Sequence, residues 1–432
     1  MKKIIITMLG VLAASLLTAE GGLDFTGDIQ TIWGVGAPWT DEDASAGRLL
    51  LGDTSLKGKL DAWYDNSSAL AEGSVSYDAV VKKLNFSLNE LWIDYTDSVW
   101  GIRIGRQKAA WGKADGIDIT NVLCPTDMSS FSAMTGDDSK LAIDALRLSL
   151  NGNQFTADAY WIPFFTPAAL PLNEGNPLRK YVVPATYDLT IEALNQTLTI
   201  PVYIGEMDKP ETALWNGEFG AKLSGYFSAF DVSLYGFYGW DDIPVFEYKV
   251  SISEPTAQMP FSLPDGIIVN GVYKRMGMFG ADAAIPIKNI VLRTEAAFFP
   301  QRYFAMEEQR NELSALAGLD WMPSGWTLTA QYFCDVVFGD LETIEREDAY
   351  THGSTLSITR TFLNETLEAG ISGVLNFNEF DSMISPSVNY SLSDQIKLET
   401  GAYIFIPGPD ENGKYGQYKD LSTIYIKAKY SF

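Results

Sequence analysis

Charged side chains that alternate with apolar ones are the residues of this sequence best suited to chemistry. In each predicted strand they fall on the face opposite the apolar residues, where they could line a water-filled pore. These candidates are Arg103, Lys222, Arg293, Glu295, Lys397, Glu399, Lys427 and Lys429. Charges at the narrowest part of a pore set its selectivity. The alternative is that each charge is solvated or paired with a neighbour across strands.

A group of carboxylates falls in one long connection between two predicted strands, residues 108–138. The group comprises Asp115, Asp118, Asp127, Asp137 and Asp138. If this connection folds into the pore, an acidic loop would face a largely cationic wall, and polar solutes would align in the field between them. The alternative is an ordinary surface loop whose charges are solvated.

Other chemistries have few residues to support them. His352 is the only histidine, and Ser354 and Asp348 are near it in sequence, but neighbours along a strand seldom converge as a catalytic triad. Cys124 and Cys334 are too few for a zinc cluster or a disulfide framework. The acidic runs lack the ligand spacing of a calcium loop. The sequence therefore predicts no enzyme, no metal site and no cofactor.

The composition favours strands over helices. Of the 432 residues 13% are aromatic and 37 are glycine, a mixture typical of strands and turns. The mean hydropathy of −0.01 is too low for a polytopic helical membrane protein of this length. The net charge of −24, without a long basic run, argues against nucleic-acid binding.

The N-terminus has the features of an export signal. Lys2 and Lys3 precede an apolar stretch, Ile4 to Leu17, and the small residue Ala19 stands at the expected cleavage point. We expect residues 1–19 to be a signal peptide and residues 20–432 to form one exported domain. The alternative, an uncleaved membrane anchor, has an apolar core too short to span a bilayer comfortably.

Period-2 alternation recurs along the rest of the chain and is clearest in its last segment. One face of that segment carries Ile424, Ile426, Ala428, Tyr430 and Phe432, and the other carries Thr423, Tyr425, Lys427, Lys429 and Ser431. Strands with one apolar and one polar face occur in soluble sandwiches and in outer-membrane barrels.

The lengths of the connections distinguish these two folds. We count about 18 strands, with 16 as the alternative, and the connections between them mostly alternate between short and long. Short turns on one side and long loops on the other are typical of a transmembrane, antiparallel, up-and-down β-barrel in the cell outer membrane. The long loops predicted to be extracellular are 108–138, 163–214 and 241–269, and a short helix is expected near Thr190–Leu198.

Two local patterns resemble known proteins. The ending, with Tyr430 and the final Phe432, resembles the C-terminal signature of Gram-negative outer-membrane proteins, which implies recognition by the barrel-assembly machinery. Residues 88–127 resemble a motif of large porin-like barrels, in which a Gly-Arg-Gln strand end is followed by Trp-Gly and an Asp-rich loop. The matching segments are Leu88–Tyr95, Gly105-Arg-Gln107, Trp111-Gly112, Ala114-Asp-Gly116 and Pro125-Thr-Asp127.

The motif also leads to specific structural expectations. Because Trp100, Ile102 and Ile104 would face lipid, Arg103 should point into the lumen. Gly105 would let the backbone bend where the strand leaves the membrane. Trp111 would be an aromatic residue at the membrane interface.

These observations predict a porin-like channel for passive diffusion of small hydrophilic solutes. Outer-membrane lipid is an expected partner, and a homo-oligomer is compatible with this class of protein. A surface-exposed adhesin or structural barrel with an occluded lumen is the alternative, because long loops could either narrow the pore or bind a partner.

Overall fold

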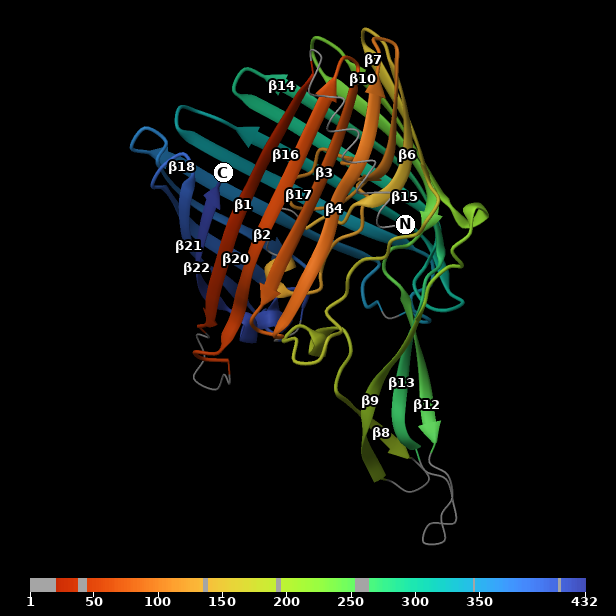
Figure 1. Ribbon diagram of the computed structural model, residues 1–432. Helices are drawn as coiled ribbons and strands as arrows, with labels where there is room; N and C mark the ends of the chain where they lie inside the picture. Colours follow the sequence, from red (N-terminus) through yellow and green to blue (C-terminus); the bar gives the residue numbers. More distant parts are fainter. Residues whose placement is uncertain are drawn as a thin grey trace, which may run out of the picture.

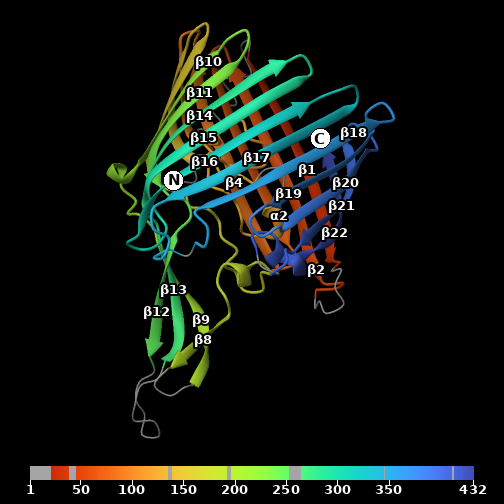
Figure 2. The ribbon, with the colours of Figure 1, turned by 180° about the vertical axis from the view of Figure 1, so that it is seen from behind.

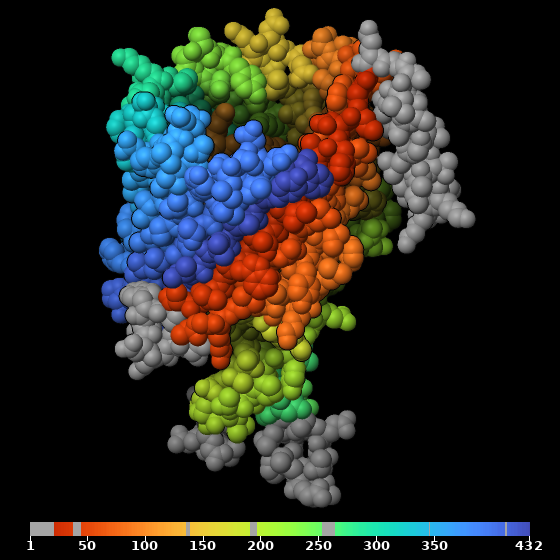
Figure 3. Space-filling model, turned by 60° about the vertical axis from the view of Figure 1, so that its left-hand side comes forward, coloured from red at the N-terminus to blue at the C-terminus, as the bar shows by residue number. Residues whose placement is uncertain are grey.

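The chain forms a closed antiparallel β-barrel. The computed structural model describes residues 21–37, 45–134, 139–191, 196–252, 264–344, 346–410 and 413–432. Eighteen strands form one sheet, and β1 (Gly22–Gly36) pairs with β22 (Thr423–Ser431) to close it. Figure 3 shows this closure, where the blue C-terminal strands adjoin the red N-terminal ones. The predicted 18-strand barrel is thus confirmed. No helix in the described ranges has the length and apolar character needed to cross a membrane.

Sixteen further strands complete the barrel between β1 and β22. They are β2 (Leu49–Tyr64), β3 (Ser67–Asp78), β4 (Lys83–Thr96), β5 (Trp100–Gln107), β6 (Ile143–Asn151), β7 (Phe155–Ile162), β10 (Glu218–Tyr226), β11 (Asp231–Trp240), β14 (Arg275–Ile287), β15 (Ile290–Tyr303), β16 (Gln309–Trp321), β17 (Trp326–Phe338), β18 (Tyr350–Phe362), β19 (Leu367–Asn376), β20 (Ser382–Ser391) and β21 (Ile396–Ile406). Most neighbours in sequence are also neighbours in the barrel (Figure 1).

The alternation of the sequence sets the inside and the outside of the barrel. In β22 the outward Ile424 and Ile426 are 55% and 58% exposed, whereas the inward Tyr425 is 4% exposed. An apolar outer face would be costly in water but suits hydrocarbon. The inner faces carry the polar and charged residues of the wall, together with aromatic residues that pack against loops.

The two ends of the barrel differ in their connections. At one end the turns are short, and Asp65, Lys288 and Asn364 adopt positive φ there. Asn and Asp tolerate this conformation better than most residues. The other end carries the long connections, including residues 108–142, which hold the short helix α2 (Phe131–Met134), and the 3₁₀ helix η4 (Gly416–Leu421).

A second, four-stranded sheet projects from the end with the long connections (Figures 1 and 2). It consists of β8 (Thr186–Ile191), β9 (Gln196–Asp208), β12 (Val245–Ile252) and β13 (Pro264–Val272), in the order β12–β13–β9–β8. The helix expected near Thr190–Leu198 is wrong, because the described residues of that segment belong to the β8–β9 hairpin. Leu189 pairs with Leu198 there, and both contact the buried apolar core of this sheet.

Candidate pore constriction

The connection between β5 and β6, residues 108–142, turns into the lumen immediately after β5. Gly105 has φ +129°, and a Cβ at this position would lie 2.2 Å from the carbonyl oxygen of Leu91. Only glycine fits such a conformation against a neighbouring strand. The unusual conformation expected at Gly105 is therefore present, but β5 continues through it to Gln107 with no shift in register.

Glu295 on β15 holds this loop against the opposite wall. Its carboxylate accepts hydrogen bonds from the backbone N–H of Lys113 (2.6 Å), Ala114 (2.8 Å) and Thr120 (2.8 Å), and from the Thr120 hydroxyl (2.7 Å). Gly112 allows the approach, because a Cβ there would lie 2.4 Å from the carboxylate. Glu295 is 3% exposed, so these bonds are shielded from water.

Three more side chains of the wall bind the same loop segment. The Gln331 amide on β17 receives a hydrogen bond from Asp115 N–H (3.0 Å) and donates one to the Asp115 carbonyl (2.7 Å). Arg293 donates to the Lys113 carbonyl (3.0 Å), and Tyr235 accepts from Gly112 N–H (3.1 Å). The loop that leaves β5 is thus fixed to β11, β15 and β17 across the barrel.

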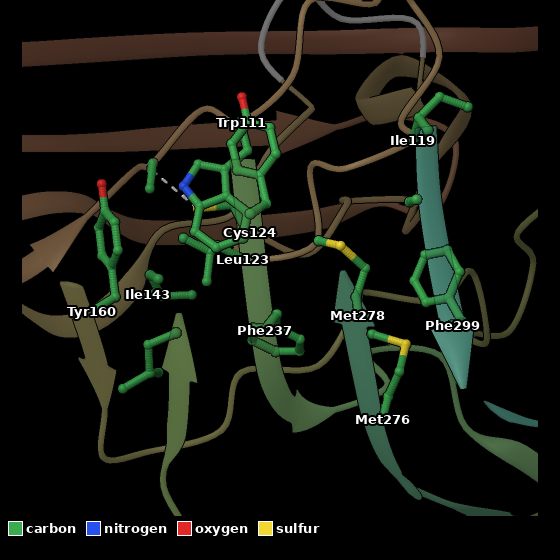
Figure 4. Close-up of a cluster of buried hydrophobic side chains, with 14 of the residues drawn as sticks. Trp111, Ile119, Leu123, Cys124, Ile143, Tyr160, Phe237, Met276, Met278 and Phe299 are labelled. Atoms are coloured by element: carbon green, nitrogen blue, oxygen red, sulfur yellow. Dashed lines mark hydrogen bonds between the residues drawn. The ribbon is translucent and has the colours of Figure 1, made fainter. Parts of the chain in front are cut away.

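Apolar side chains fill the space between the loop and this part of the wall (Figure 4). Trp111 is 4% exposed and packs against Tyr235 (ring centroids 5.0 Å apart) and Tyr160 (6.1 Å). Met276, Met278 and further residues of β6, β7 and β14–β17 complete the cluster. The expectation of an interfacial Trp111 is therefore wrong, because the bend after β5 directs the loop inward and buries the indole inside the barrel.

The other side of the lumen holds a polar cavity of about 570 Å³. It lies between β1–β4 and the inward loop, and serine and asparagine side chains make up much of its lining. Its basic residues are Lys57, Lys83, Arg106, Lys108, Lys140 and Lys429. Its acidic residues are Asp28, Asp53, Asp78 and Asp127. The loop thus separates an apolar, filled side of the barrel from a polar, hollow one.

Many of the wall charges pair with a neighbouring strand. Arg103 points inward, donates to Asp94 (2.9 Å) and stacks on Trp92. Further ion pairs are Lys427–Glu399 (3.3 Å), Lys429–Asp28 (3.8 Å) and Arg293–Asp320. The Lys222 ammonium lies above the Tyr235 ring, 5.5 Å from its centroid, and Lys397 lies on β21 near its short turn. Of the eight wall candidates, Lys429 lines the cavity.

The candidate carboxylates of the loop occupy different surroundings. Asp118 forms an ion pair with Lys140 (2.5 Å). Asp127 accepts a hydrogen bond from Ser129 N–H (2.9 Å) and lines the polar cavity. Asp115 is bound to the wall through its main chain. Asp137 and Asp138 lie outside the described residues.

The two cysteines, the histidine and its neighbour Asp348 take part in packing and hydrogen bonds of the fold. Cys124 and Cys334 are both free thiols, and Cys124 accepts a hydrogen bond from Ala109 N–H (3.2 Å). Burial raises the pKa of the Cys124 thiol. His352 lies on β18, where Nδ1 is 2.9 Å from the Tyr332 hydroxyl and the imidazole packs against Tyr350 and Phe377. Asp348 accepts a hydrogen bond from Asn378.

Two of the four wall side chains that hold the loop, Gln331 and Tyr235, are not among the residues that the sequence singled out. Gln331 and Tyr235 lie on the inward faces of their strands, so alternation could have selected them as lumenal. Their partners are main-chain groups more than 100 positions away, Asp115 and Gly112 respectively. Main-chain groups carry no residue-specific signal, and only the fold brings them together.

The sequence matches the model of a family described as "Protein of unknown function (DUF1302)" over residues 42–376. No curated protein matches the sequence.

Solved structures similar to this one are outer-membrane barrels. Pseudomonas aeruginosa OccK3 (OpdO) has a TM-score of 0.54 and 8% sequence identity, with 98% of this chain and 99% of that chain covered. Acinetobacter baumannii OccAB3 has a TM-score of 0.53 and 6% identity, covering 95% and 99%. The outer membrane protein opdK from Pseudomonas aeruginosa has a TM-score of 0.52 and 7% identity, covering 95% and 99%. These likenesses show a common fold.

Proposed function

The chain belongs to the DUF1302 family, and we propose that it is an outer-membrane channel for passive diffusion of small hydrophilic solutes. One observation carries the proposal: the barrel encloses a polar cavity of about 570 Å³ beside an inward loop that is fixed to the wall. In a barrel that only supports surface loops, side chains could fill the whole lumen. Here polar side chains line a hollow beside the loop. Binding and conduction, rather than catalysis, suit this lining.

The route we propose follows the polar side of the lumen, along β1–β4. The opposite side is blocked by the apolar cluster around Trp111 and Met278. The loop is the constriction, and its position depends on Glu295. Because the wall cations Arg103, Arg293 and Lys427 are paired with carboxylates, local pairs rather than one uniform field would meet a solute.

The same proposal places the long connections, including 163–214 and 241–269, outside the cell and the short turns in the periplasm. Tyr430 and Phe432 would form the signal for barrel assembly. Tyr430 lies on the outer face of β22 and Phe432 directly follows that strand; they are 41% and 44% exposed, where an assembly factor could reach them. A homo-oligomer is compatible with the proposal but is not required by it.

A second candidate function is a surface-interaction barrel with an occluded lumen. The observation that favours it is the projecting sheet of β8, β9, β12 and β13 on the side of the long connections. Loops also pack near that end, where Phe131, Tyr181 and Leu421 join one apolar cluster. Such a barrel would bind a partner without conducting.

Solute uptake into vesicles tests the proposed route. Ser76 on β3 lines the cavity, whereas the adjacent Val75 pairs with Leu56, which is 48% exposed on the outer face. Ser76→Trp should slow the swelling of proteoliposomes in small sugars or amino acids several-fold, and Val75→Trp should not. Equal rates for the native protein and Ser76→Trp would contradict a route along β3.

A further inference from the structure

We propose that the turn η3 (Leu214–Asn216) anchors the barrel in the membrane interface on the side of the long connections. Trp215 is 79% exposed and Leu214 is 59% exposed. The turn precedes β10, and its short coil projects sideways from the wall in Figures 1 and 2. Tryptophan combines an apolar ring with a polar N–H group and concentrates where hydrocarbon meets water.

The wall holds this turn rigidly in its projecting position. Arg275 donates hydrogen bonds to the carbonyls of Asn216 (2.9 Å) and Gly217 (3.0 Å), and the Trp240 indole N–H donates to Asn216 (3.0 Å). The Arg275 guanidinium also stacks on Trp240, 4.1 Å from the ring centroid. Gly217 lets the turn pack closely, since a Cβ there would lie 2.9 Å from the Trp161 indole nitrogen. The exposure of Leu214 and Trp215 is thus built into the fold.

The strands next to the turn are too short for their apolar surface to cover the full thickness of the hydrocarbon. β7 and β10 pair over eight residue pairs, from Glu218–Ile162 to Gly225–Phe155. At ~3.4 Å per residue and a tilt of about 40°, this part of the wall is about 18 Å high. The apolar band of an outer-membrane barrel is about 25 Å high. Leu214 and Trp215 precede β10, and Phe219 at the start of that strand is also exposed (55%), so exposed apolar side chains occur both in the turn and at the adjoining end of the wall.

Tryptophan fluorescence in brominated lipid tests the anchor, which rests on the proposed membrane placement. The folded protein is reconstituted into phosphatidylcholine vesicles, with or without bromine on acyl carbons near the headgroup. The emission of one indole is obtained by subtracting the spectrum of a variant from that of the native protein. The three variants are Trp215→Phe, Trp100→Phe and Trp111→Phe. Trp100 is outward at the short-turn end, 44% exposed, and Trp111 is buried in the lumen. We expect Trp215 and Trp100 to be quenched by shallow bromine and Trp111 to be spared.

The possible results separate the anchor from the placement. Quenching of Trp100 without quenching of Trp215 would overturn the anchor while leaving the membrane placement intact. Quenching of neither would contradict the placement itself. If Trp215 is not quenched and Trp215→Ala lowers the oligomer mass in detergent, a second copy of the chain is the occupant and the anchor is wrong.

Arg275→Lys tests how the turn is positioned. Lysine retains the charge but lacks the planar pair of donors that binds two carbonyls at once. The quenching of Trp215 should fall by half or more, whereas that of Trp100 should not change. Unchanged quenching of Trp215 would refute the positioning role of Arg275.

Discussion

Both carboxylate oxygens of Glu295 accept hydrogen bonds from the loop, and this residue joins two segments far apart in sequence. A buried carboxylate is costly unless its hydrogen bonds are complete. Glu295 has donors from Lys113, Ala114 and Thr120, so its charge stabilises the inward position of the loop rather than opposing folding.

Replacing Glu295 with glutamine should release the loop. The new amide group would face backbone N–H donors, so at least one buried donor would lose its acceptor, at a cost of about 2–3 kcal/mol. We expect faster proteolysis between residues 112 and 120 and a noisier channel current. Glu368→Gln is the control, because its side chain bonds to Asn389 on the adjacent strand. Identical proteolysis of the two variants would contradict the role of Glu295.

Asp242, in the connection after β11, makes stability depend on pH. Burial and then the adjacent Asp241 raise its pKa from 3.8 to about 6. Between these values the folded chain holds a proton that the unfolded chain has lost, so this contribution is present at pH 4 and is lost as the pH rises through 6. Asp242→Asn should flatten the dependence of urea unfolding on pH from 4 to 7. Asp208 is an exposed carboxylate of β9, and Asp208→Asn should leave the pH dependence of urea unfolding unchanged.

Residue alternation predicts which side chains face the lumen but not what they bind there. Arg103 was expected to point inward and does so, yet its pairing with Asp94 and Trp92 depends on the register of β4 against β5. Alternation also predicts that Glu295 is a pore-lining charge. The structure instead buries it beneath a loop whose path no local pattern specifies.

Among the elements, β5 depends on Gly105, which takes a positive φ two residues before the strand ends at Gln107 and the inward loop begins. Gly105→Ala should either prevent stable folding or lower the free energy of unfolding by several kcal/mol. The Cβ of the new alanine would overlap the Leu91 carbonyl oxygen. Gly116→Ala is the matched control, since φ is also positive there (+71°) but no atom lies within 4 Å of the added Cβ. Gly116→Ala should lower the free energy of unfolding by about 1–2 kcal/mol. Heat-modifiability on gels and urea unfolding would measure both, and equal losses would contradict the steric argument.

Sequence periodicity predicted the barrel strands well because lipid and water impose opposite demands on alternate residues. The projecting sheet escaped detection for a physical reason. Its central strands β9 and β13 pair in parallel although they lie in different connections, 163–217 and 241–274, and no local pattern predicts such a pairing. The wrong expectation for Trp111 has a related cause. An aromatic residue just after a strand can lie at the membrane interface or inside the lumen, and the path of the loop decides between the two positions.

At the scale of the whole molecule, the barrel is divided into a filled and a hollow side. The hollow side has six basic and four acidic lining residues, although the whole chain has a net charge of −24. Local charges at the constriction, rather than the net charge, set ion preference. We therefore expect a weak preference for anions, which Lys83→Glu in the cavity wall should shift toward cations.

Single-channel conductance of the refolded protein in a planar bilayer, under a salt gradient, is the decisive test of whether the barrel is an open channel. A channel should give discrete, stable current steps and a reversal potential on the anion side, which Lys83→Glu should move toward cations. Absence of current from correctly folded, heat-modifiable protein would contradict the channel and favour a surface-interaction barrel.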